Sequence, residues 1–307
     1  MSAAFDHDAK RAIRQALAQK AYRDDAVRLI DPDVTGWRWL VASHNGLFAV
    51  APGKWKRLLH GWLFGICRDG GELYLFENCG RHDRSSNQGR IVRLEIEDGK
   101  LVRPKVLIKG LDGNCHQVRV IDGLICVVDT ANQAILRFTR EGQPVDVKRP
   151  FPPAPADDRS GAYLHLNSIA RVGGRLALML HNGKALPEKC SELAWLDDAW
   201  QITGRVPLGG HKCHDIVADA RGAIWHSASM SGEIIASDGR RVAISSDLMT
   251  RGMAFSGDLL AVGLSIFSDR HLRDGQRGSL AVLDRELAVQ EILDLPGSPT
   301  DIAVIMD

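Results

Sequence analysis

Two histidines follow cysteines at matching places in two similar segments. Cys115 and His116 precede one pair of apolar runs separated by a turn, and Cys213 and His214 precede another such pair. Neutral imidazole is the commonest metal ligand in proteins and titrates close to physiological pH, which suits general acid or base catalysis. The shared pattern predicts that His116 and His214 serve one site.

These segments belong to a repeat of short strands and tight turns. Five rows with a Gly-containing turn between two apolar runs begin at Phe64, His116, Leu166, His214 and Arg251. Successive rows are about 35 to 50 residues apart, which is the length of one four-stranded propeller blade.

A sixth row is divided between the two ends of the chain. The C-terminal TDIAVIMD resembles the first strand of a blade, and WRWLVASHNGLFAVAPGKWKRLL resembles the other three strands. Joining them closes a ring and removes exposed sheet edges. The pattern therefore predicts an all-β fold, a six-bladed β-propeller whose C-terminal strand is innermost. A pair of β-sandwiches would not explain the divided row.

The chain preceding the repeat has a different character. We expect residues 1–36 to form a helical extension and residues 37–307 to form the propeller as a single domain. Within the extension, the pattern predicts a helix from residue 6 to about residue 31. Ala9, Ile13, Ala16 and Leu17 would lie on its apolar face.

A propeller brings the start of each first strand and the end of each second strand to one face. These positions hold five histidines, two acidic residues and an arginine: His44, His116, His165, His181, His214, Glu77, Asp129 and Arg251. We therefore expect a candidate site at one mouth of the central channel.

Three neutral imidazoles with an open fourth position match a catalytic zinc site, and they also suit iron, copper or nickel. Blades one, three and five alternate, so His44, His116 and His214 would point inward at about 120° to one another. His165 is the alternative third ligand. The sequence predicts a divalent transition metal, with zinc favoured.

The remaining candidates have supporting roles. Asp215 and Glu77 would orient the metal ligands. Glu77, Asp129 or His181 would act as acid or base, and Arg251 would hold an anionic group of the substrate. Hydrolysis, a lyase step and oxygen chemistry at iron or copper all stay open. A non-catalytic module that binds a protein, peptide or sugar is the alternative from another class.

The cysteines and one further histidine are expected in the core. Adjacent residues of a strand point in opposite directions, so a His that faces the channel directs its Cys into the sheet interior. We therefore expect Cys115 and Cys213 to be small core residues, although inward thiolates would instead make a soft-metal site. His226 lies inside a strand and is also expected in the core.

The composition limits the classes of partner that we expect. The formal net charge is +1 with 25% charged residues, which gives no reason to expect nucleic acid or a membrane surface. The chain shows no apolar leader, no membrane-length run, no GxGxxG, no P-loop and no GxSxG elbow. We expect a cytoplasmic protein that acts on a small molecule or short peptide.

The rows resemble the NHL-repeat and gluconolactonase-like six-bladed propellers over about residues 37 to 307. YLHLNSIARVGGRLALML, GHKCHDIVADARGAIWHSAS and TRGMAFSGDLLAVGLS are also similar to a bacterial propeller family of unknown function. Gluconolactonase-like enzymes hold a divalent metal with Glu, Asn and Asp. The resemblance carries over Asn167 alone, as a residue beside the metal, and the histidines replace the oxygen ligands that calcium prefers.

Peptidyl-hydroxyglycine amidating lyase is similar in its site. It is a six-bladed propeller that holds zinc with three histidines from separate blades. His116, His214 and either His44 or His165 look like that arrangement, which implies a lyase-type zinc centre by analogy of geometry.

Overall fold

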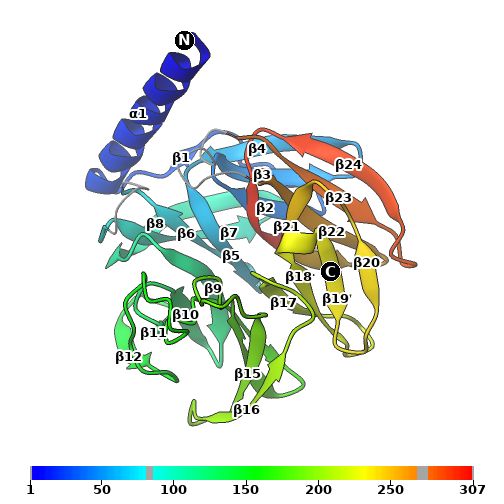
Figure 1. Cartoon of the computed structure of the whole chain (residues 1–307). Helices are drawn as coiled ribbons and strands as arrows, with labels where there is room; N and C mark the ends of the chain where they lie inside the picture. The colour runs from blue at the N-terminus through cyan, green and yellow to red at the C-terminus, as the bar shows by residue number, and fades with distance from the viewer. Residues whose placement is uncertain (1, 81–85, 268–275, 306–307) are drawn as a thin grey trace.

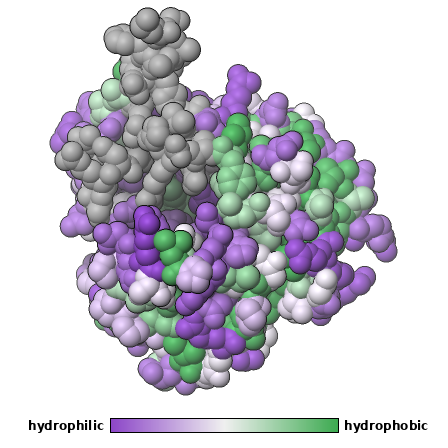
Figure 2. Space-filling view, viewed as in Figure 1, coloured by the Kyte–Doolittle hydropathy of each residue, from purple (hydrophilic) through white to green (hydrophobic). Residues whose placement is uncertain are grey.

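Six antiparallel sheets surround a common axis in the computed structural model, which describes residues 2–80, 86–267 and 276–305 (Figure 1). This arrangement confirms the predicted six-bladed β-propeller. Hydrophilic and hydrophobic residues are interspersed over the face seen in Figure 2. No helix in the described part of the chain is long and apolar enough to cross a membrane.

The strands follow the predicted rows. Blade one contains, from the inside outward, β25 (Pro299–Val304), β2 (Trp39–Ser43), β3 (Gly46–Ala51), β4 (Lys54–His60) and β1 (Arg28–Leu29). Blade two contains β5 (Leu63–Asp69), β6 (Glu72–Asn78), β7 (Gly89–Glu97) and β8 (Lys100–Leu111). Blade three contains β9 (Cys115–Ile121), β10 (Leu124–Asp129), β11 (Ala134–Phe138) and β12 (Pro144–Lys148).

The second half of the ring is built in the same way. Blade four contains β13 (Leu166–Val172), β14 (Arg175–Leu180), β15 (Glu192–Leu196) and β16 (Ile202–Pro207). Blade five contains β17 (His214–Ala218), β18 (Ile224–Ala228), the 3₁₀ turn η1 (Ser229–Ser231), β19 (Glu233–Ala236) and β20 (Arg241–Ala243). Blade six contains β21 (Leu248–Ser256), β22 (Leu259–Ile266), β23 (Gly278–Leu283) and β24 (Val289–Leu295).

The ring closes as the sequence predicts. The C-terminal strand β25 pairs antiparallel with β2, and Val41 lies opposite Ile302. This pairing gives β2 a partner from the other end of the chain, so β2 has no unpaired inner edge and β25 becomes the innermost strand of blade one.

Tight turns join the first two strands of the blades. In blade three, Asp122 and Gly123 have φ angles of 52° and 77°. In blade four, Gly173 and Gly174 have φ angles of 55° and 77°. Two consecutive residues with positive φ are typical of the two-residue hairpin turn that matches strand twist. The DG and GG pairs are therefore the residues that these turns require.

The hydrophobic core consists of layers between neighbouring blades. Between blades two and three, for example, Tyr74 and Phe76 pack with Cys115, Val118 and Ile125, all buried. Each sheet is thus covered on its two faces by the two neighbouring sheets. The continuous apolar runs seen in the sequence follow from this burial.

The N-terminal segment differs from its prediction. Helix α1 spans Ser2–Arg23, and residues 28 and 29 form strand β1 at the outer edge of blade one instead of continuing the helix. The predicted apolar face was wrong, because Ile13 is 60% exposed and Leu17 is 48% exposed. The helix buries Ala18 and Ala21 instead. The expected domain boundary after residue 36 stays a prediction.

Candidate functional site

Four imidazole rings from blades three, four and five form a continuous row, three from the starts of first strands and His181 from the end of β14. We call His116, His165, His181 and His214 the histidine row. The ring centres of His116 and His165 are 5.1 Å apart, those of His165 and His181 are 4.4 Å apart, and those of His181 and His214 are 5.1 Å apart. The structure therefore brings together four of the five predicted histidines.

Irregular backbone directs these side chains to one place. His165 comes directly before β13 with a φ of 54°, and Asp215 follows His214 with a φ of 64°. The pairing of β17 with β18 also shifts register after His214. Positive φ is uncommon for residues other than glycine, and bulges of this kind re-aim side chains near active sites. The repeat predicts the strand starts, but these local departures set the direction of the rings.

Backbone contacts assign different protonated nitrogens to the histidines. The Nδ1 atoms of His116 and His214 lie 2.8 Å from the carbonyl oxygens of Asn114 and Lys212. A carbonyl only accepts hydrogen bonds, so Nδ1 carries the proton in both neutral rings and Nε2 carries the lone pair.

His181 has the opposite arrangement. Its Nδ1 accepts a hydrogen bond from the backbone N–H of Gly183 at 3.1 Å. In the neutral ring the proton is therefore on Nε2. In the neutral rings, His116 and His214 therefore have a lone pair on Nε2, whereas His181 has a proton on Nε2.

Burial and neighbouring charge keep two of these rings neutral. Burial lowers the pKa of His181 well below its usual value, and His214, His116 and Arg251 lower it further. Burial also lowers the pKa of His214, with Arg251 the next cause. Both rings are uncharged at neutral pH, which metal ligation and acid–base chemistry both require.

Arg251, expected at this mouth, is near enough to the row for its charge to lower the pKa of both His181 and His214. It occupies β21 and is buried. The Arg251 guanidinium thus lies buried near two imidazoles whose pKa it lowers.

His44 lies apart from the row. Its ring packs 5.0 Å from that of Phe64 and 6.0 Å from that of Trp62, and Phe64 in turn lies 6.2 Å from His116. An aromatic side chain thus stands between His44 and the row. The structure brings His165, the alternative third ligand, next to His116.

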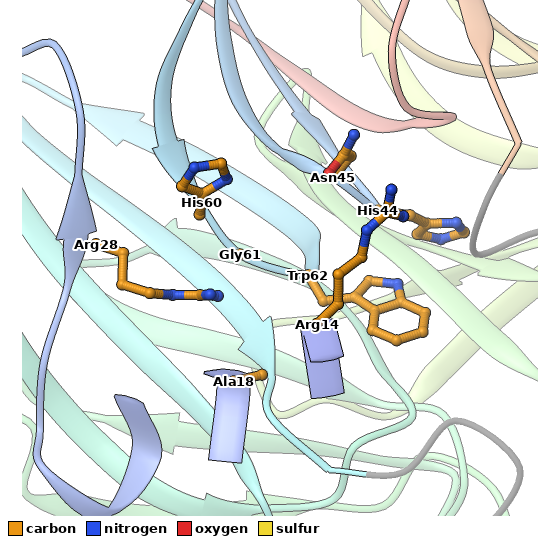
Figure 3. A pocket seen from close by; sticks show the side chains of 8 residues that line it. All are labelled: Arg14, Ala18, Arg28, His44, Asn45, His60, Gly61 and Trp62. Atoms are coloured by element: carbon orange, nitrogen blue, oxygen red, sulfur yellow. The ribbon is translucent and has the colours of Figure 1, made fainter. Parts of the chain in front are cut away.

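A small basic pocket adjoins His44. It has a volume of about 50 Å³ and lies between α1 and blade one. Arg14 and Ala18 of the helix face His44, Asn45, Arg28, His60, Gly61 and Trp62 across it (Figure 3). Burial, followed by the charges of Arg57, Arg28 and Arg14, lowers the pKa of His60. Of the two arginines that line this pocket, Arg28 lies 3.7 Å from the carboxylate of Glu77.

The two acidic candidates do not contact the row. Glu77 is buried against Arg90, whose Nε and Nη2 donate to it at 2.9 and 2.7 Å. Arg90 also donates to the carbonyls of Ala21 and Ala26, so this ion pair anchors the end of α1. Asp129 accepts hydrogen bonds from Asn132, and burial raises its pKa. These placements favour structural roles, and catalysis by either residue stays a prediction.

The residues expected to orient the ligands instead join blades within the channel. Asn167 donates to the carbonyl of Cys213 at 2.9 Å. Asp215 accepts from the backbone N–H of Met253 at 2.8 Å and lies 3.5 Å from Arg119. Burial, with the nearby charge of Asp301, raises the pKa of Asp215.

Sequence reasoning missed the ion pair at the centre of this network. Arg119 contacts Asp301 at 2.9 and 3.1 Å, and Asp301 also accepts from the backbone of Ile66. A charged residue between the two valines of HQVRVI was the available signal. These contacts tie the closing strand β25 to blades two and three.

The cysteines of the repeated dipeptide lie in the core, as expected. The side chains of Cys115 and Cys213 are fully buried, and burial raises the pKa of both thiols, that of Cys213 to about 12. The thiols face the layers between blades, and the following histidines face the mouth.

The donor atoms around the histidine row fit a metal ion only in part. Among the residues that the structure describes, no group of three or more His, Cys, Asp or Glu side chains that could hold a metal ion is found. The rings of His116 and His165, with centres 5.1 Å apart, have a suitable spacing, since two imidazoles on one tetrahedral zinc have centres about 5 Å apart. The Nε2 lone pairs of His116 and His214, with Nδ1 held by a carbonyl, are also the form in which histidine binds metals.

The propeller is similar to several solved structures. A chain of the nidogen–laminin complex aligns with a TM-score of 0.63 and 12% identity, covering 88% of this chain and 99% of that one. The periplasmic gluconolactonase of Pseudomonas aeruginosa aligns with a TM-score of 0.57 and 13% identity, covering 87% and 98%. A protein of unknown function from Bacteroides caccae aligns with a TM-score of 0.56 and 13% identity, covering 88% and 99%.

No family model matches the sequence, and no curated protein matches it. At identities of 12 to 13%, the structural likeness shows the fold alone. It agrees with the predicted resemblance to NHL-repeat and gluconolactonase-like propellers.

Proposed function

We propose that this protein is a metal-dependent hydrolase or lyase that acts on a small anionic substrate at the histidine row. The observation that carries the proposal is the row itself. Four imidazole rings lie side by side at one mouth of the channel, and backbone contacts assign the protonated nitrogen of three of them.

His116 and His214 would hold the metal through Nε2, with His165 as the third ligand. The carbonyls of Asn114 and Lys212 would keep the Nδ1 protons in place. Ser229 adds a contact to His214, with its Oγ 2.9 Å from Nδ1. A bound zinc or similar ion supplies Lewis acidity, which polarises a substrate oxygen or lowers the pKa of a water.

His181 is a hydrogen-bond donor in this proposal. The hydrogen bond from Gly183 occupies Nδ1, so the Nε2–H is the group that a neutral His181 has to offer. The low pKa of His181 makes its protonated form scarce at neutral pH. It therefore acts by donating a hydrogen bond to developing negative charge, as donors of an oxyanion hole do.

Positive charge would select an anionic substrate. Arg251 flanks the row, and Arg14 and Arg28 line the basic pocket beyond His44. A carboxylate or phosphate held by these groups would place its reacting part over the row. The reduced state of all six cysteines fits the expected cytoplasmic location, which belongs to this proposal.

Elemental analysis of untagged protein tests the proposal. We expect about one zinc, iron, copper or nickel per chain in the wild type and none in the double variant His116→Ala/His214→Ala. His60→Ala, an exposed histidine outside the row, is the matched control and should retain the metal. Iron or copper in place of zinc would redirect the assignment to oxygen chemistry.

A wild-type protein that holds no metal and takes none up on reconstitution would overturn the metal-dependent enzyme. The propeller would then be assigned as a binding module for a protein, peptide or sugar, with the row as a hydrogen-bonding surface.

A further inference from the structure

A second pocket lies between blades four and five and shares no lining residue with the histidine row. Its volume is about 530 Å³, within the range of small-molecule sites. Apolar side chains of both blades form most of its wall: Met179, Leu193, Trp195, Val206, Leu208, Ile216, Ile224, Ile235 and Ala236.

One polar side chain is buried in this apolar wall. His226 in β18 is 4% exposed, and its Nε2 has no hydrogen-bond partner among the described residues. A buried polar atom without a hydrogen-bond partner carries the full free-energy cost of its lost hydration. Such atoms are rare in native proteins. The sequence pattern predicted a core position for His226, which is confirmed, but it did not predict a pocket in front of the ring.

The charges around the pocket favour an uncharged ligand. Burial, followed by the charge of Arg241, lowers the pKa of His226 to about 4, so the ring is neutral. Arg241, the charged residue of the lining, is itself paired with Glu233 at 2.7 Å. A carboxylate that entered the pocket would lose its hydrating water. Arg241 would not offset this cost, because it is already paired.

We propose that this pocket binds a small, mainly apolar molecule that carries one hydroxyl group, and that the hydroxyl bonds Nε2 of His226. A hydroxyl both donates and accepts, so it satisfies Nε2 in either neutral tautomer of the ring. The apolar body of the ligand would cover the side chains of the two blades. The site is independent of the proposed metal chemistry.

Paired probes test the hydroxyl requirement. Calorimetric titration of the full-length protein with 2-naphthol and with naphthalene compares the same ring system with and without the hydroxyl. We expect 2-naphthol to bind about tenfold more tightly, as one buried hydrogen bond allows. In His226→Phe, which keeps an aromatic ring and removes the polar nitrogens, this preference should disappear while naphthalene binding persists.

A second variant tests the location without altering the histidine. Val206→Trp places a large side chain at an exposed position of the pocket wall, and it should abolish binding of both probes. Val145→Trp, at a similarly exposed position of the outer strand of blade three, is the control and should bind like the wild type. Absence of binding to the wild type, a preference that survives in His226→Phe, or unchanged binding in Val206→Trp would each overturn the proposal.

Discussion

His116 and His214 are held by the same contact in two different blades. Each directs Nδ1 to the carbonyl oxygen of the residue two positions earlier, Asn114 or Lys212, at a distance of 2.8 Å. The repeated Cys-His pair therefore forms the same local structure twice. In each copy the thiol is buried and Nε2 of the following histidine is directed to the mouth of the channel. Ser229 is an additional contact found only at His214.

The contact between Ser229 and His214 leads to a prediction on metal affinity. Removing the hydroxyl with Ser229→Ala should weaken zinc binding by about tenfold, because residues that orient a ligating histidine typically contribute 10- to 100-fold. Competition with a chromophoric chelator measures the affinity. Ser231→Ala, which alters the other end of the same 3₁₀ turn, is the control. Equal zinc affinity in the two variants would argue against His214 as a ligand.

The buried His226 predicts a pH dependence of stability. Its pKa is about 4 in the folded chain and about 6.5 in the unfolded chain, so the unfolded chain binds more protons between these values. The free energy of unfolding should therefore fall by roughly 3 kcal/mol on this account as pH decreases from 6.5 to 4. Urea unfolding of His226→Phe should lack this part of the pH dependence, whereas the exposed-site control His211→Phe should retain it.

The ion pair of Glu77 and Arg90 predicts a large cost for a single substitution. Glu77→Gln leaves a buried guanidinium without its counter-ion, so we expect the free energy of unfolding to fall by about 3 to 5 kcal/mol. Chemical denaturation measures it. Glu97→Gln, at an exposed pair with Arg103, should change stability very little. A large metal loss with little destabilisation in Glu77→Gln would instead favour the role predicted from the sequence.

The contacts of Asp301 predict that this residue stabilises the closure of the ring. It joins β25 to Arg119 of blade three and to the backbone of Ile66 of blade two. Asp301→Ala should lower the free energy of unfolding by about 3 kcal/mol or more, because Arg119 loses a buried partner. Asp258→Ala, at an exposed pair with Arg38, is the control. Similar urea midpoints for the two variants would contradict this account.

Much of the architecture was readable from sequence because blade formation rests on local pattern. Alternation of apolar runs with turns such as Asp122–Gly123 determined the strands, and the divided row determined the closure of β25 on β2. The alternation of side chains along a strand also determined that Cys115 and Cys213 are buried when the next residue faces the mouth.

Only the tertiary structure decided which side chains meet. Phe64 separates His44 from the row, whereas the left-handed backbone of His165 brings its ring beside His116. Glu77 lies at a strand end, as predicted, yet its partner Arg90 was not evident from the repeat. The physical reason is that periodicity records which face of a strand is buried, while the partner of a buried charge or ring depends on packing between segments far apart in the chain.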